Sequence, residues 1–245
     1  MRTALLVTSV LATLCAWAQD STRTLSRFEI GITGTFERSY RTLAATESGN
    51  DYSYIMDRRD DFEIPLAGYS AGLEIAFTAC YRWHVESGIR YSMTGWATDE
   101  LPVTTYVSPE GNLNYPAIPS TARFLYHYHY VGVPLILRYE FGKRKLHFAP
   151  AIGFIGETLL DQTAVFILER QDGHESRESF SDTFTEYNST SLSAYSDVGV
   201  IYRFNEHLGM RLAATGRYQL TELVNAPITA HLWSVGFLAG LRYHF

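Results

Sequence analysis

Two histidines, His127 and His129, lie two positions apart within an aromatic stretch of the chain. Residues two apart on a β-strand share a face, and two imidazoles on one face can ligate a metal ion. Tyr126, Tyr128 and Tyr130 alternate with the histidines, and such a mixture suits the interface between a membrane and water. We therefore expect this pair to serve the interface and predict no metal site.

A second set of candidate ligands lies in an acidic stretch, where Asp172 and Glu175 flank His174. The spacing that a calcium-binding loop requires is absent, so we expect a solvated loop. Serine, histidine and acidic residues, the types that hydrolases and acyltransferases use, also occur in the polar stretches. Because no nucleophile elbow or comparable motif organises them, we expect no enzymatic activity and no cofactor.

Charged residues of both signs recur on one side of segments whose other side is apolar. If these positions face a common interior, the charges must pair, because an isolated buried charge is strongly penalised. We expect this set to form a structural network of ions rather than a path for protons or ions. The predicted members are Glu29, Glu74, Glu86, Arg90, Arg138, Arg211, Arg217 and Arg242.

The segments that carry these charges alternate with a period of two, which is typical of β-strands. We expect eight strands, near residues 28–37, 69–79, 85–94, 124–139, 146–159, 191–204, 208–218 and 233–245. Short connections near 81–83, 142–145 and 205–207 alternate with long polar ones at 40–66, 97–121, 161–190 and 221–230. This alternation predicts an all-β fold, an eight-stranded antiparallel up-and-down transmembrane β-barrel, with both termini on the periplasmic side.

The composition supports a barrel in lipid. Only 19% of the residues are charged and the net charge is −6, which argues against a disordered chain and against a nucleic-acid partner. The apolar faces carry almost no charge, whereas a soluble barrel would hold its apolar side chains inside. Aromatic residues near the strand ends predict two interfacial belts. They are Tyr81, Trp83, Trp96, Tyr128, Tyr139, Tyr202, Tyr218, Trp233 and Tyr243.

The N-terminus has the features of a secretory signal. A positive residue, Arg2, precedes an apolar run, and Ala16 and Ala18 match the small-residue rule for cleavage. We expect residues 1–18 to be the signal peptide and residues 19–245 to form one barrel domain.

Two motifs resemble those of known bacterial barrels. The final strand ends with Leu241, Tyr243 and Phe245 on alternate positions, similar to the signal that the barrel assembly machinery reads in outer-membrane proteins. Residues 130–139 and 217–220 resemble the PorT-like outer-membrane barrel family of Bacteroidota. Pro134 is the most distinctive residue, and a proline in a strand predicts a bulge or bend. The resemblance implies an eight-stranded barrel in the bacterial outer membrane.

We expect a structural, adhesive or partner-binding role that involves outer-membrane lipid, a closed polar lumen and long acidic outer loops, with a surface partner. One alternative is an accessory barrel of a type IX-like secretion or gliding system, which would contact its partner through the turns near Arg82, 143–145 and 205–207. Another alternative is an outer-membrane lipid-modifying enzyme.

Overall fold

The computed structural model describes residues 27–45, 50–80, 82–103, 119–170, 173–181, 187–224 and 226–245. The expected signal peptide, including Ala16 and Ala18, lies outside the described residues, as do Tyr81 and Asp172. None of the helices in the described part of the chain has the length and apolar character needed to cross a membrane.

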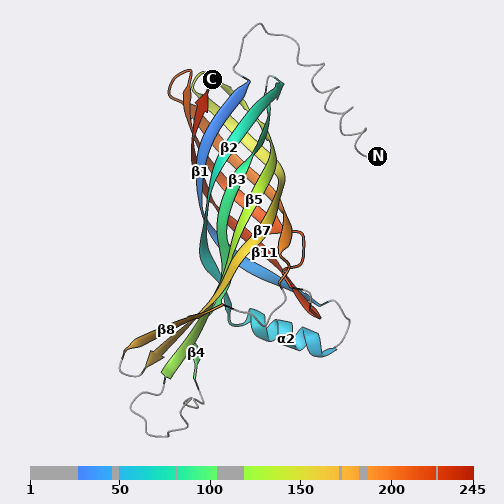
Figure 1. The fold of residues 1–245 in the computed structure, drawn as a ribbon, viewed down its shortest axis with the longest axis vertical. Helices are drawn as coiled ribbons and strands as arrows, with labels where there is room; N and C mark the ends of the chain where they lie inside the picture. Colours follow the sequence, from blue (N-terminus) through green and yellow to red (C-terminus); the bar gives the residue numbers. More distant parts are fainter. Residues whose placement is uncertain are drawn as a thin grey trace.

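Eight long strands form a closed antiparallel ring, so the predicted all-β up-and-down barrel is confirmed (Figure 1). They are β1 (Phe28–Ala45), β2 (Glu63–Cys80), β3 (Trp83–Thr98), β5 (Pro119–Tyr139), β7 (Leu146–Arg170), β9 (Thr190–Arg203), β10 (Leu208–Gln219) and β11 (Ile228–His244). Each long strand pairs with the next one along the chain, and β11 pairs with β1 to close the ring. Closure gives every strand of the ring a partner on both sides, so no edge remains there.

Four shorter elements lie in connections that the sequence analysis treated as turns or loops. They are α2 (Asn50–Asp60), β4 (Leu101–Pro102), β6 (Phe141–Lys143) and β8 (Glu175–Phe180). The loop expected at 161–190 is wrong in its first half, because β7 continues to Arg170 and then pairs with β8. Polar residues at 161–163 resemble the start of a loop, but the apolar run at 164–168 restores a strand.

The continuation of β5 and β7 builds a sheet that projects beyond the ring. We call residues 101–102, 119–126, 164–170 and 175–180 the projecting sheet, with the strand order β4-β5-β7-β8. The rings of Phe124 and Phe166 lie opposite each other with centroids 4.5 Å apart. Figure 1 shows this sheet and α2 at the end of the barrel opposite the C-terminus.

Aromatic rings surround the outward face near both ends of the ring. At the C-terminal end the close pairs include Trp83 with Tyr139 (4.8 Å between centroids), Phe141 with Phe148 (4.9 Å) and Tyr243 with Phe245 (5.3 Å). At the projecting end they include Tyr40 with Trp233 (6.0 Å), Tyr69 with Tyr91 (6.2 Å) and Tyr218 with His231 (6.0 Å). Between these belts the outward positions carry large apolar side chains such as Phe36 and Phe237.

Two residues expected in the belts point inward instead. Trp96 and Tyr128 are only 6% and 2% exposed, and they pack with Tyr130, Leu223 and Leu232 inside the projecting end of the ring. The reason is parity: both lie an even number of residues from inward-facing Arg90 and Arg138 on their strands. We call this apolar group the inner cap.

Candidate functional site in the barrel lumen

All eight charged residues predicted to form a network lie on inward-facing positions of the ring. The side chains of Arg138, Glu86 and Arg211 are at most 1% exposed, and that of Arg217 is the most accessible of the eight at 9%. Each of the eight forms an ion pair inside the lumen, the interior of the ring. The alternation of the strands puts them there because successive side chains point to opposite faces.

The network has its densest part at the C-terminal end of the lumen. Glu86 lies 2.7 Å from Arg138, 2.6 Å from Arg242 and 3.0 Å from Arg211. Arg138 also lies 2.8 Å from Glu29, and Arg242 lies 3.1 Å from Glu74. These contacts join strands on opposite sides of the ring, so the ions connect its walls as well as neutralise one another.

A second group lies nearer the inner cap and is built around Arg217. Its guanidinium lies 3.2 Å from Glu37 and 2.9 Å from Glu157. Serine hydroxyls donate to the same carboxylates, from Ser234 to Glu37 (3.0 Å) and from Ser193 to Glu157 (2.9 Å). Each carboxylate therefore has both an ionic and a neutral partner, as a buried carboxylate requires.

The sequence analysis missed several members of the network. Glu37, Glu157 and Asp197 all occupy inward positions, and Asp197 pairs with Arg211 at 2.6 Å. Strict alternation would have found these three residues, because they lie on predicted strands. Glu140 follows the end of β5, where no periodic pattern places it, yet it lies 3.0 Å from Arg138 and 2.9 Å from Arg203.

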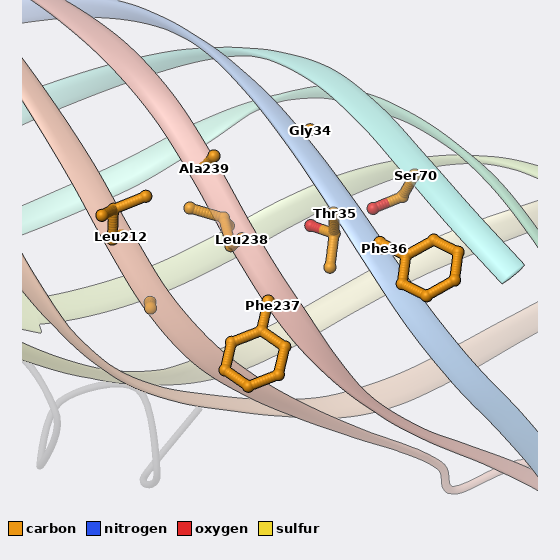
Figure 2. Close-up of a pocket in the computed structure, with 9 residues that line it drawn as sticks. Gly34, Thr35, Phe36, Ser70, Leu212, Phe237, Leu238 and Ala239 are labelled. Carbon is orange, nitrogen blue, oxygen red and sulfur yellow. The ribbon is translucent and has the colours of Figure 1, made fainter.

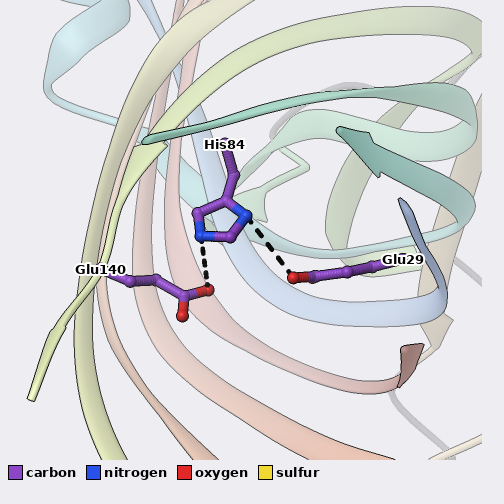
Figure 3. Close-up of side chains that lie close together, drawn as sticks. All are labelled: Glu29, His84 and Glu140. Carbon is purple, nitrogen blue, oxygen red and sulfur yellow. Dashed lines mark ion pairs between the residues drawn. The ribbon is translucent and has the colours of Figure 1, made fainter. Parts of the chain in front are cut away.

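Among the described residues, one group has the types and spacing of a metal site: Glu29, His84 and Glu140, all buried. Figure 3 shows that the two carboxylates approach opposite nitrogens of the His84 ring, Glu29 at Nδ1 (3.5 Å) and Glu140 at Nε2 (3.6 Å). The guanidinium of Arg138 already lies within 3.0 Å of both carboxylates. A permanent positive charge so close repels a second cation, so the arrangement favours an ion cluster over a metal centre.

The other histidines singled out from the sequence lie far from this cluster along the strands. His129 shares a 2.6 Å hydrogen bond with the Tyr91 hydroxyl and stacks on its ring, within the belt at the projecting end. His127 lies opposite Thr163 on β7. His174 is exposed just before β8, and Glu175, the first residue of β8, is exposed as well.

The lumen holds paired ions at the C-terminal end and the inner cap at the projecting end. Leu223, which is 1% exposed, reaches the inner cap from the connection between β10 and β11, held by a backbone hydrogen bond from its own N–H to Ala230. Tyr187 and Val224 form a bridge between two connections beside it. The chemistry available in the lumen is therefore the pairing of fixed charges.

Comparison with known proteins agrees with this architecture. The model of a family described as "Outer membrane protein beta-barrel domain" matches residues 17–220. No curated protein matches the chain at a significant level.

Several solved structures have a similar shape at low sequence identity. Neisserial surface protein A (NspA) is 13% identical, with a TM-score of 0.41, and the match covers 91% of this chain and 100% of that chain. The outer membrane protein OprG from Pseudomonas aeruginosa is 13% identical, with a TM-score of 0.43 and coverage of 90% and 98%. The outer membrane protease OmpT from Escherichia coli is 8% identical, with a TM-score of 0.43 and coverage of 93% and 100%.

Proposed function

The chain belongs to the family of outer membrane protein beta-barrel domains, and from that premise we propose that it is a non-enzymatic outer-membrane barrel that binds a macromolecular partner through its projecting sheet. In this proposal the ring anchors the protein in the membrane, and the projecting sheet is the surface that binds the partner. The ring and its ion pairs hold that surface at a fixed position above the bilayer.

The projecting sheet is the observation that carries the proposal. Strand β7 has 25 residues, whereas β9, its neighbour in the ring, has 14. A transmembrane strand needs only about 9–11 residues, so β7 extends well past the bilayer. The outermost strand, β8, presents exposed Arg177, Glu178 and Phe180. Such a mixture of charged and aromatic side chains on a supported strand suits recognition of another protein.

The orientation belongs to the same proposal. We place the projecting sheet outside the cell and the C-terminus in the periplasm, because bacterial barrels have short periplasmic turns and longer outer loops. The turns at the C-terminal end are short, with two residues between β6 and β7 and four between β9 and β10.

A finer assignment to the PorT-like barrels of Bacteroidota has support from β5. Pro134 pairs with Ile155 on β7, but the pairing of β5 with β3 is interrupted between Leu135 and Gly132. Proline has no N–H to donate, so the interruption accommodates it on the β3 side without a change of register. This local feature explains how the strand tolerates the proline of the motif in residues 130–139, which supports the resemblance to the family.

A type IX-like accessory role is the second candidate, and one surface favours it. Lys143 ends β6 at the C-terminal end, and Arg144 and Lys145 form the turn that follows it. All three are exposed, as is Arg82 in the neighbouring turn. These cations form a basic surface that an acidic periplasmic partner would recognise.

Site-specific photo-crosslinking in cells distinguishes the two candidates. A photoreactive residue replaces Ser179 on β8 in one variant and Lys143 in the other, both at exposed positions. We expect protein adducts from position 179. Adducts from position 143 alone would favour the accessory role, and an absence of adducts from both would reject partner binding. Turnover of phospholipid or lipid A by the purified protein would reject the non-enzymatic assignment.

A further inference from the structure

The outward face of the barrel carries an unusual charge. On β1, β2, β9, β10 and β11 the outward-facing positions hold a single Asp, Glu, Lys or Arg residue, which is Arg38 on β1. An arginine facing lipid costs roughly 2–4 kcal/mol at the bilayer midplane and about 0–1 kcal/mol near the interface. Its presence on this face therefore indicates a position near the interface.

The neighbours of Arg38 locate it at the depth of the aromatic belt. Tyr40, the next outward residue on β1, packs against Trp233 in the belt at the projecting end. Arg38 is exposed and lies opposite Val235 on β11 and Ala67 on β2. Within the described part of the chain, its side chain makes no ion pair or hydrogen bond. A guanidinium at this depth lies where the phosphates of membrane lipids begin.

A groove lies on the same face, and Phe36, the outward residue that precedes Arg38 on β1, is one of the residues that line it. It has a volume of about 490 Å³ and is lined by residues of β1, β2, β10 and β11. Figure 2 shows the rings of Phe36 and Phe237 side by side, with Gly34 and Ala239 further along the same two strands. Phe36 is two residues from Arg38, about 7 Å along the strand.

The groove has a glycine, Gly34, in its floor, and the packing of the strands does not require a glycine at this position. A Cβ atom built on Gly34 would meet only the Ser70 carbonyl oxygen, at 4.0 Å. By contrast, a Cβ on Gly236 would lie 2.3 Å from the Phe36 carbonyl oxygen, so that glycine is needed for the close approach of two strands. Gly34 therefore leaves open space on the lipid-facing side, between walls formed by Phe36, Phe237 and Leu212.

We propose that Arg38 and this groove form a binding site for a phosphate-bearing membrane lipid of the leaflet at the projecting end. The guanidinium of Arg38 would bind the phosphate, which matches its charge and its two-pronged geometry. One acyl chain would lie in the groove against Phe36 and Phe237. The proposal depends on the outer-membrane location and not on the partner-binding role of the projecting sheet.

Native mass spectrometry of the full chain in non-ionic detergent tests the site with three probes: phosphatidylglycerol, diacylglycerol and inorganic phosphate. We expect retention of phosphatidylglycerol alone. Arg38→Gln should weaken retention about tenfold, the typical value of a hydrogen bond to a charged group. Gly34→Leu should weaken it as well by filling the groove. Lys143→Gln, which removes an exposed cation at the other end, is the matched control.

Other outcomes overturn the proposal. Equal retention by Arg38→Gln and the wild type would remove the phosphate contact. Equal retention of diacylglycerol would show that the groove binds acyl chains without a headgroup. Retention of inorganic phosphate alone would mean a simple anion site. Dimers that Gly34→Leu abolishes would assign the groove to a second copy of the chain. Heat-modifiable migration of each variant on gels confirms that its barrel is folded.

Discussion

At the scale of single residues, the ion network in the lumen is held together by carboxylates that each contact more than one arginine. Glu86 contacts Arg138, Arg211 and Arg242, and each of these arginines contacts a further acid. Removing one cation therefore takes a counter-charge away from more than one carboxylate. The cost comes from the desolvation of the acids that remain, not from the lost attraction alone.

Arg138→Met should destabilise the barrel by about 3–5 kcal/mol, the range for breaking a buried ion pair. The arginine is fully buried and lies within 3.0 Å of Glu29, Glu86 and Glu140. Urea unfolding of the protein in lipid vesicles measures the change. The matched control is Arg203→Met, because Arg203 pairs with Glu140 but its side chain is 28% exposed. It should cost about 0–1 kcal/mol, and equal losses in both variants would contradict the account.

The alternation of apolar and polar residues predicts which face of a strand a side chain lies on, but not which residues it contacts. Alternation separates inward from outward residues, so it indicated that Arg211 and Arg242 face the lumen. It does not encode which acid meets which arginine, because Arg242 and Glu29 are 213 positions apart in the chain. Nor does it apply to Glu140, which lies between two strands.

At the scale of elements, the strands are longer than their apolar portions. The sequence predicted the middle of every ring strand, since the lipid-facing side there is uniformly apolar. It missed the ends of these strands. There the two faces of a strand no longer meet different surroundings, so the alternation of apolar and polar residues is lost. Strand β5 begins at Pro119, before its expected start near residue 124, because it is paired there with β7 and not because lipid covers it.

The last strand also carries a prediction of its own. Phe245→Ala should reduce the amount of assembled protein in the outer membrane several-fold if the alternate residues Leu241, Tyr243 and Phe245 form an assembly signal. The ring of Phe245 is 62% exposed, so its loss should leave folding into vesicles in vitro unchanged. The control is Phe237→Ala on β11, the strand that Phe245 directly follows, because Phe237 is 75% exposed. Equal assembly of both variants in cells would reject the signal.

At the scale of the whole molecule, the two ends of the barrel differ in length and character. Two turns offer matched insertion points, because each contains a residue with positive φ: Gly173 at 79° and Arg144 at 64°. A protease site inserted after Gly173 should be cleaved on intact cells. The same site after Arg144 should be cleaved only when the outer membrane is permeabilised. The reverse pattern would invert the proposed orientation.

The pairing of the first strand with the last sets the order of events in biogenesis. Residue 29 pairs with residue 244, so the ring cannot close between β1 and β11 until residue 244 has been synthesised and exported. Contacts between such distant parts of a chain form slowly because a long loop must close first. Until that pairing forms, the sheet keeps unpaired edges and exposed apolar faces, which make an unclosed barrel prone to aggregation.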